Sequence, residues 1–202
     1  MPIDLHLHTL HSDGTFTPEE VIRRAKSLRM TTISVTDHDT LAALPAARKA
    51  AGTDLEILTG TELTAVSHDR ELHVLGYGFR EDDAAMLDYI KRAQERRQTR
   101  MQLMVNKLNE AGVPVTIEEV REIAKGASIG RPHLAEALLK RGIVHSLNEA
   151  FNRYIGDDAP CFVREAILTV PDSVRLTMMP CSASLSIIIW IRLWRKSCAR
   201  RM

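Results

Sequence analysis

Short apolar segments alternate with amphipathic segments along the first eighty residues. The apolar segments carry period-two patterns or β-branched runs, which predict strands at 2–8, 31–36, 55–63 and 71–77. One intervening helix is expected to begin at the capping box Thr17-Pro18-Glu19-Glu20, and another to span 40–51 and end at Gly52. The last two strands are expected to pair through the polar turn 67–70. This alternation predicts an α/β fold with a parallel sheet or barrel.

The pattern changes at Glu81, where helical periodicity replaces the alternation. One long amphipathic helix is predicted over 82–112, and shorter helices are predicted at 117–125, 132–141 and 146–154. The chain is therefore divided into an α/β part at 1–81, a helical insertion at 82–158 and a tail at 159–202. The basic positions of the long helix are expected to form a solvated stripe, at Lys91, Arg92, Arg96, Arg97 and Arg100.

The tail differs in composition from the rest of the chain. Asp172 is the last acidic residue, and both tryptophans and two of the three cysteines follow it. We interpret 159–202 as an aberrant or truncated C-terminal tail, and we hypothesise a frameshift or chimeric junction within 165–175. Resequencing the gene tests this hypothesis, which an intact tail in independent clones would contradict.

Charge and composition exclude several classes of function. The formal net charge of +1 gives no basis for stable DNA binding or a membrane-surface role, and the three cysteines do not suggest a disulfide framework. No signal peptide is apparent. The apolar run 187–191 is far shorter than the roughly 20 residues that a spanning helix needs. A cytoplasmic protein is expected.

Histidines and carboxylates gather after the predicted strands. His6 and His8 share one face of the first strand, because side chains alternate along a strand. Four further candidate metal ligands follow along the chain, at Asp13, His38, Glu62 and His73. Imidazoles combined with carboxylates suit Mn²⁺, Zn²⁺ or Fe²⁺, and Mn²⁺ tolerates the oxygen-rich set best. Two closely spaced ions would suit phosphoryl displacement.

These motifs resemble those of the PHP domain family, the polymerase and histidinol phosphatase family. The resemblance covers residues 2 to about 165, and it rests on His6-Leu7-His8-Thr9, Ser12-Asp13-Gly14, Thr36-Asp37-His38-Asp39-Thr40, Gly60-Thr61-Glu62 and Leu72-His73-Val74-Leu75-Gly76-Tyr77. Two later motifs look like the branch that dephosphorylates nucleoside 3′,5′-bisphosphates and trims short RNA from the 5′ end; they are Ile129-Gly130-Arg131-Pro132-His133-Leu134-Ala135 and Ala150-Phe151-Asn152-Arg153-Tyr154-Ile155-Gly156.

The resemblance implies the N-terminal part of a distorted (β/α)₇ barrel with up to three divalent ions and a metal-bound hydroxide that attacks phosphorus. By position, the two histidines of the first strand hold one ion with Glu62. Asp13 and His38 hold a second ion, and Glu62 and His73 a third. No protein nucleophile is implied.

The resemblance also implies supporting residues and a function. Arg131 and His133 would grip substrate phosphate, since a guanidinium fork suits that task, and Asp37 would orient an imidazole ligand. The expected function is a metal-dependent phosphoesterase that acts on a nucleotide or a short oligonucleotide.

Two other functions stay open at this point. Members of the family complete their site with a histidine in an Ala-His-Pro segment and a late Asp-x-His pair, whereas no histidine follows His145 here. A catalytically inactive PHP remnant that binds only metal or a partner is therefore the alternative. A helical RNA- or protein-binding module at 82–158 is the third possibility.

Overall fold

Three parallel strands form the first sheet of the protein. The computed structural model describes residues 2–67, 70–164, 168–177 and 190–193. The strands of the first sheet follow the order β1-β2-β3, with bounds Ile3–Leu7, Thr32–Val35 and Glu56–Ile57. Helices α1 (Pro18–Ser27) and α2 (Leu44–Ala51) pack on it through a shared apolar cluster that includes Ile22, Ile33 and Leu44.

The second sheet is built around an antiparallel pair. Its order is β6-β4-β5-β7, with bounds Leu168–Thr169, Gly60–Ser67, Arg70–Tyr77 and Trp190–Leu193. The predicted pairing of the third and fourth strands is confirmed, because β4 and β5 pair antiparallel along their whole length. A single bridge between His38 and Glu62 joins the end of the first sheet to the second. The α/β class is therefore confirmed, and closure into a seven-stranded barrel stays a prediction.

The predicted strand 55–63 is wrong in one respect, because it is two strands. β3 belongs to the first sheet and β4 to the second, so Glu62 lies within an eight-residue strand instead of closing one. The chain passes close to β2 at the break, where a Cβ on Gly60 would lie only 2.2 Å from the Ser34 hydroxyl. Apolar or β-branched residues occupy every second position from Leu55 to Leu63, so the pattern predicted one strand where the structure has two.

The predicted helix 40–51 starts four residues later than expected. Asp39 has a positive φ of 49°, and the Thr40 hydroxyl accepts a hydrogen bond from the Ala42 N–H at 3.2 Å, so this segment is a loop. Helix α2 begins at Leu44, which puts Pro45 in the first turn, where its missing N–H has no helical partner to lose.

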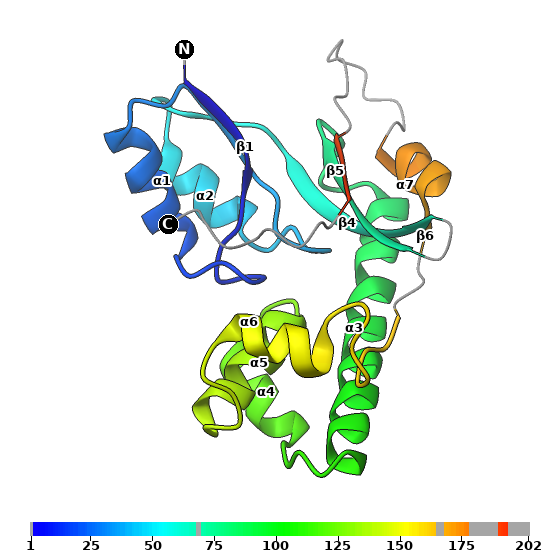
Figure 1. The fold of residues 1–202 in the computed structure, drawn as a ribbon. Helices are drawn as coiled ribbons and strands as arrows, with labels where there is room; N and C mark the ends of the chain where they lie inside the picture. The colour runs from blue at the N-terminus through cyan, green and yellow to red at the C-terminus, as the bar shows by residue number, and fades with distance from the viewer. Residues whose placement is uncertain (1, 68–69, 165–167, 178–189, 194–202) are drawn as a thin grey trace.

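The helices that follow lie where periodicity predicted them, with ends that differ by a few residues. They are α3 (Ala84–Glu110), α4 (Ile117–Ala124), α5 (Arg131–Lys140) and α6 (Leu147–Ala150), which continues as a π-helical turn, η1 (Phe151–Ile155). Figure 1 shows α3 running from the second sheet to the bundle formed by α4, α5 and α6. Its first half packs on β4 and β5 through Met86 and Tyr89, and its second half packs in the helical bundle through Met104 and Leu108.

The expected solvated stripe on α3 is wrong at two positions. Arg97 and Arg100 are only 7% and 8% exposed, whereas Lys91, Arg92 and Arg96 are exposed as expected. Residues three apart share a helix face, and here that face meets the second sheet. The buried face of α3 is therefore wider than its apolar positions indicate, because it also includes these two arginines.

Arg97 forms a buried ion pair with Asp39, whose side chain is fully buried. Its Nε donates to Asp39 Oδ2 at 2.7 Å, and the Tyr89 hydroxyl donates to Asp39 Oδ1 at 2.6 Å. Burial alone would raise the pKa of Asp39, but the Arg97 charge and these hydrogen bonds hold it below its usual value. The pair fixes α3 against the loop that follows β2.

Part of the tail is described. A short helix, α7 (Val170–Thr177), follows β6, and Thr177 packs against Gly76 of β5, where a Cβ would lie 2.3 Å from the threonine methyl group. No element was predicted for these residues. The described part leaves out residues 165–167, 178–189 and 194–202, so the frameshift hypothesis stays a prediction. It also leaves out His68 of the predicted turn. Among the described helices, none is both long and apolar enough to cross a membrane.

Replacing Arg97 with methionine is expected to lower the free energy of unfolding by about 3–5 kcal/mol, because it leaves the Asp39 carboxylate buried and unpaired. Urea unfolding measures this loss. The matched control is Arg92→Met on the same helix, whose exposed ion pair with Asp88 is worth about 0–1 kcal/mol. Equal losses in the two variants would contradict a stabilising role for the buried pair.

Candidate metal centre

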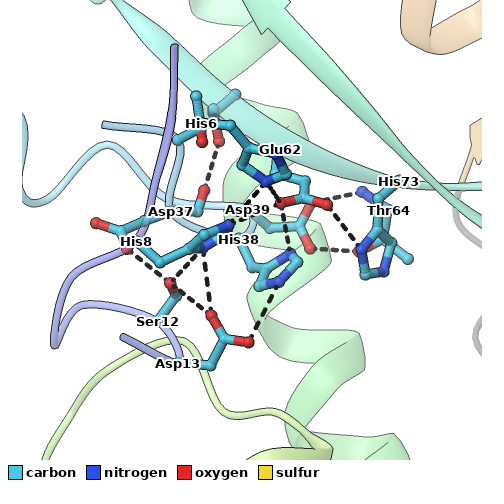
Figure 2. Close-up of polar contacts among 12 residues, drawn as sticks. His6, His8, Ser12, Asp13, Asp37, His38, Asp39, Glu62, Thr64 and His73 are labelled. Carbon is cyan, nitrogen blue, oxygen red and sulfur yellow. Dashed lines mark hydrogen bonds and ion pairs between the residues drawn. The ribbon is translucent and has the colours of Figure 1, made fainter. Parts of the chain in front are cut away.

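Two histidines, one on β1 and one directly after it, point toward Glu62 of the second sheet. His6 and His8 lie two residues apart on one face, and their Nε2 atoms are 3.0 Å apart (Figure 2). Because a strand alternates its side chains, this convergence follows directly from the His-x-His sequence. Two ring nitrogens this close are suited to sharing one ligand.

A tight turn after β1 brings Asp13 back to His8. The Gly14 N–H donates to the Thr9 carbonyl at 3.0 Å, and a Cβ on Gly14 would lie 2.4 Å from the carbonyl oxygen of His8. Only glycine fits this approach. The turn places Asp13 Oδ1 3.2 Å from His8 Nδ1, and the Asp13 side chain remains 27% exposed.

Asp37 holds this turn in place. Its carboxylate accepts the Thr9 N–H at 2.7 Å, the Thr9 hydroxyl at 2.6 Å and the Ser12 hydroxyl at 2.6 Å. Ser12 Oγ also lies 3.3 Å from His8 Nδ1. Asp37 was predicted to orient an imidazole, and the structure connects it to His8 through Ser12.

Glu62 lies at the centre of the cluster. Its Oε2 is 2.9 Å from the Nε2 atoms of His6 and His8 and 3.9 Å from His38 Nδ1, and its Oε1 is 2.8 Å from His73 Nδ1. The Glu62 side chain is 4% exposed. Burial alone would raise the pKa of Glu62, but the charge of His38 and the hydrogen bonds from the other imidazoles hold it well below its usual value.

His38 completes the connection between Asp13 and Glu62. Its Nε2 lies 3.6 Å from Asp13 Oδ2. Its Nδ1 is buried, and within the described part of the chain it has no hydrogen-bond partner. A buried polar atom without a partner is costly, so this nitrogen fits an electron-pair acceptor such as a metal ion.

The six predicted ligands therefore lie together, and they form three overlapping groups. The donor atoms within each group lie within 4.8 Å of one another; the groups are His6, His8 and Glu62; His8, Asp13 and His38; and His38, Glu62 and His73. Each of these groups contains the ligands that were predicted for one ion. In addition, His8 belongs to two groups, and so does His38. The donors are nitrogen and oxygen atoms, which suit Mn²⁺, Zn²⁺ or Fe²⁺.

Protons bind strongly in this cluster. Burial alone would lower the pKa of His73, but its contacts with Glu62 and Glu71 raise it to about 9. The pKa of His8 is also raised, because the hydrogen bond to Glu62 and the charge of Asp13 outweigh burial. The carboxylates thus attract positive charge, and metal ions would replace protons there.

The two predicted phosphate ligands lie beside the cluster and have protein partners. Arg131 is 9% exposed, with NH1 2.6 Å from Asp157 Oδ1 and NH2 3.4 Å from Glu71 Oε1. His133 is 8% exposed, and its Nδ1 accepts the Gly130 N–H at 3.0 Å. Burial lowers the pKa of His133. Both residues lie at the start of α5, next to the metal-ligand loops.

Glu71 is the main residue that the sequence analysis missed. It lies on β5 two positions before His73, and its Oε1 is 3.6 Å from His73 Nε2. Side chains two apart in a strand share a face, so this spacing was the available signal. Of the remaining histidines, His145 is exposed as expected, and the carbonyl of His11 accepts the Ser128 N–H at 2.8 Å.

Comparison with known proteins identifies relatives of this chain. It is 33% identical over 174 residues to a 5′-3′ exoribonuclease of Salmonella typhimurium, across 85% of this chain and 59% of that protein. It is 30% identical over 174 residues to a 3′,5′-nucleoside bisphosphate phosphatase of Chromobacterium violaceum, across 85% of this chain and 61% of that protein. The chain thus spans less than two thirds of the length of each relative.

Two solved structures share the fold. A proposed metal-dependent phosphoesterase of Bifidobacterium adolescentis has a TM-score of 0.81 at 28% identity, over 87% of this chain and 63% of that one. An amidohydrolase of Chromobacterium violaceum with bound sulfate has a TM-score of 0.80 at 28% identity, over 88% of this chain and 63% of that one. The family model described as the PHP domain matches residues 4–141. The chain therefore belongs to the PHP domain family.

Proposed function

We propose that this chain is a metal-dependent phosphoesterase of the PHP family that hydrolyses phosphate esters of nucleotides, such as 3′,5′-bisphosphates, or of short RNA. The observation that carries the proposal is the placement of four imidazoles around the buried carboxylate of Glu62. The names of the exoribonuclease and bisphosphate phosphatase relatives support the class of substrate.

Six residues would hold the ions, with Mn²⁺ as the proposed metal and up to three ions in a full site: His6, His8, Asp13, His38, Glu62 and His73. When bound, the ions would lower the pKa of a water and neutralise charge on the phosphoryl oxygens. The chain supplies no nucleophile of its own in this proposal. Asp13 has the most exposed side chain of the predicted ligands apart from His6, so substrate is expected to approach near the turn that carries it.

Arg131 and His133 would bind substrate phosphate. The neutral ring of His133 accepts a hydrogen bond at Nδ1, so its proton is at Nε2, where it can be donated. The ion pair between Arg131 and Asp157 would open for a phosphate, because the Asp157 side chain is 43% exposed and can be solvated. Burial of the guanidinium at 9% exposure strengthens its attraction for an anion.

A metal-binding protein without turnover is the second candidate. The chain spans 59% of the exoribonuclease of Salmonella typhimurium, and all six proposed ligands lie between residues 6 and 73. Both candidate functions therefore include metal binding. They differ in whether the chain hydrolyses a phosphate ester.

The function is tested by Mn²⁺-dependent phosphate release from adenosine 3′,5′-bisphosphate, with bound metal quantified in the same sample. His8→Ala is expected to lower activity at least about 100-fold, because a lost ligand should cost more than the 10–100-fold of a lost supporting residue. His145→Ala, an exposed histidine, is the control. Full metal content and activity in His8→Ala would contradict the assigned site; metal without turnover in the unaltered chain would favour the second candidate.

Glu62→Gln is expected to abolish most metal binding while the chain stays folded, because it removes the negative charge that two of the three proposed ion positions would share. Metal content after dialysis against Mn²⁺ measures the effect. Glu56→Gln is the matched control, since Glu56 is an exposed strand residue that accepts a hydrogen bond from Thr32. Equal metal content in the two variants would refute the central role of Glu62.

Metal affinity is expected to rise with pH. In the metal-free protein the pKa of His73 is raised from 6.5 to about 9, so the ring is protonated throughout that range and an ion must displace the proton. Competition by protons grows as the pH falls below about 9, and above that value it disappears. Calorimetry in buffers of different ionisation enthalpy measures the released proton. Affinity that stays constant across this range would show that His73 takes no part.

A further inference from the structure

Glu71 is a buried carboxylate that the proposed metal centre does not use as a ligand. Its side chain is 7% exposed, and it lies between His73 of the cluster and two arginines of the helical bundle. Arg100 NH2 of α3 lies 2.8 Å from Glu71 Oε2, and Arg131 NH2 of α5 lies 3.4 Å from Oε1. Both arginine side chains are 9% exposed.

The His73 ring lies between two carboxylates. Nδ1 is 2.8 Å from Glu62 Oε1, and Nε2 is 3.6 Å from Glu71 Oε1. A histidine that binds a metal through one nitrogen usually donates the proton of the other nitrogen to a carboxylate or carbonyl, which fixes the ring and raises its basicity. Since Nδ1 faces the proposed ions, the proton on Nε2 would point to Glu71.

The two arginines compensate the charge of Glu71 in this buried place. A buried carboxylate with two guanidinium partners has little freedom to move, because leaving either partner would expose an uncompensated charge to a low dielectric.

We propose that Glu71 is a positioning residue for His73, and that Arg100 and Arg131 hold it there, so that the helical bundle sets the orientation of a metal-ligand side chain. The inference rests on the proposed metal centre for its functional meaning. Its structural part rests on the 3.6 Å contact between Glu71 Oε1 and His73 Nε2, which does not require metal. Figure 2 shows His73 at the edge of the cluster, beside Glu62 and away from His8 and Asp13.

The test replaces both members of the closest pair, as Glu71→Met with Arg100→Met. Exchanging a buried ion pair for apolar residues of similar size is often neutral for stability, whereas removing one member leaves a buried charge unpaired. The matched control is Glu118→Met with Arg121→Met, an exposed pair on α4 whose charged atoms are 3.7 Å apart. Two quantities are measured: the ring NMR signals of His73 in the metal-free protein, and Mn²⁺ affinity by calorimetry.

The proposal predicts that the His73 ring signals broaden or double in the paired variant while those of exposed His145 stay unchanged. It also predicts that the affinity for one Mn²⁺ falls about 10–100-fold, with no change in the control. Unchanged His73 signals and unchanged affinity would overturn it. If the paired variant does not fold, the same two measurements are made on Glu71→Gln, with the same expected results.

The two proposals fail differently. If the unaltered chain binds no Mn²⁺ but the His73 signals change in the paired variant, the proposed metal function is wrong and the positioning role of Glu71 stands. If the unaltered chain binds Mn²⁺ and both readouts are the same in the paired variant and the control, the positioning role is wrong and the metal centre stands.

Discussion

The contacts between the buried carboxylate of Glu62 and four histidines link the two sheets. A carboxylate that is 4% exposed must be compensated, and the compensation comes from four imidazoles on three segments of the chain. β1 and the residue directly after it contribute two of them, the loop after β2 contributes the third, and β5 contributes the fourth. The bridge between His38 and Glu62 also joins the sheets through the backbone. Fold and site therefore depend on the same contacts.

Helix α3 extends this dependence to the helical bundle. Arg97 and Arg100 lie three residues apart on its buried face, and each pairs with a carboxylate next to a cluster histidine. Asp39 follows His38 in the chain, and Glu71 contacts His73. One helix face thus pairs with carboxylates that lie beside two of the four histidines. This arrangement explains why these two cations are buried while their neighbours on the same helix are solvated.

Local sequence patterns predicted most helices and strands of the first 155 residues, and they placed the two histidines of the first motif on one face. The capping box at Thr17 is present as predicted, and the alternation of β1 correctly placed His6 and His8 on one face. These predictions depend on residues close together in sequence, whose geometry follows from helix and strand periods. The antiparallel pairing of β4 with β5 followed from the short turn between them.

The errors concern contacts between distant segments. The change of sheet at Gly60 is set by the approach of β2, and the burial of Arg97 is set by Asp39, which lies fifty-eight residues earlier. Neither partner leaves a mark in the local pattern. Glu71 is an intermediate case, because its spacing from His73 put it on the correct face, but only the fold brings Arg100 and Arg131 to it.

Diffraction from crystals soaked in Mn²⁺, recorded at a wavelength where manganese scatters anomalously, tests the central claim most directly. We expect anomalous peaks at coordination distance, about 2.0–2.3 Å, from Glu62 and its imidazole neighbours, with one peak bounded by His6 and His8. Crystals that diffract well but show no anomalous peak within reach of Glu62 would contradict the assignment of this cluster as a metal centre.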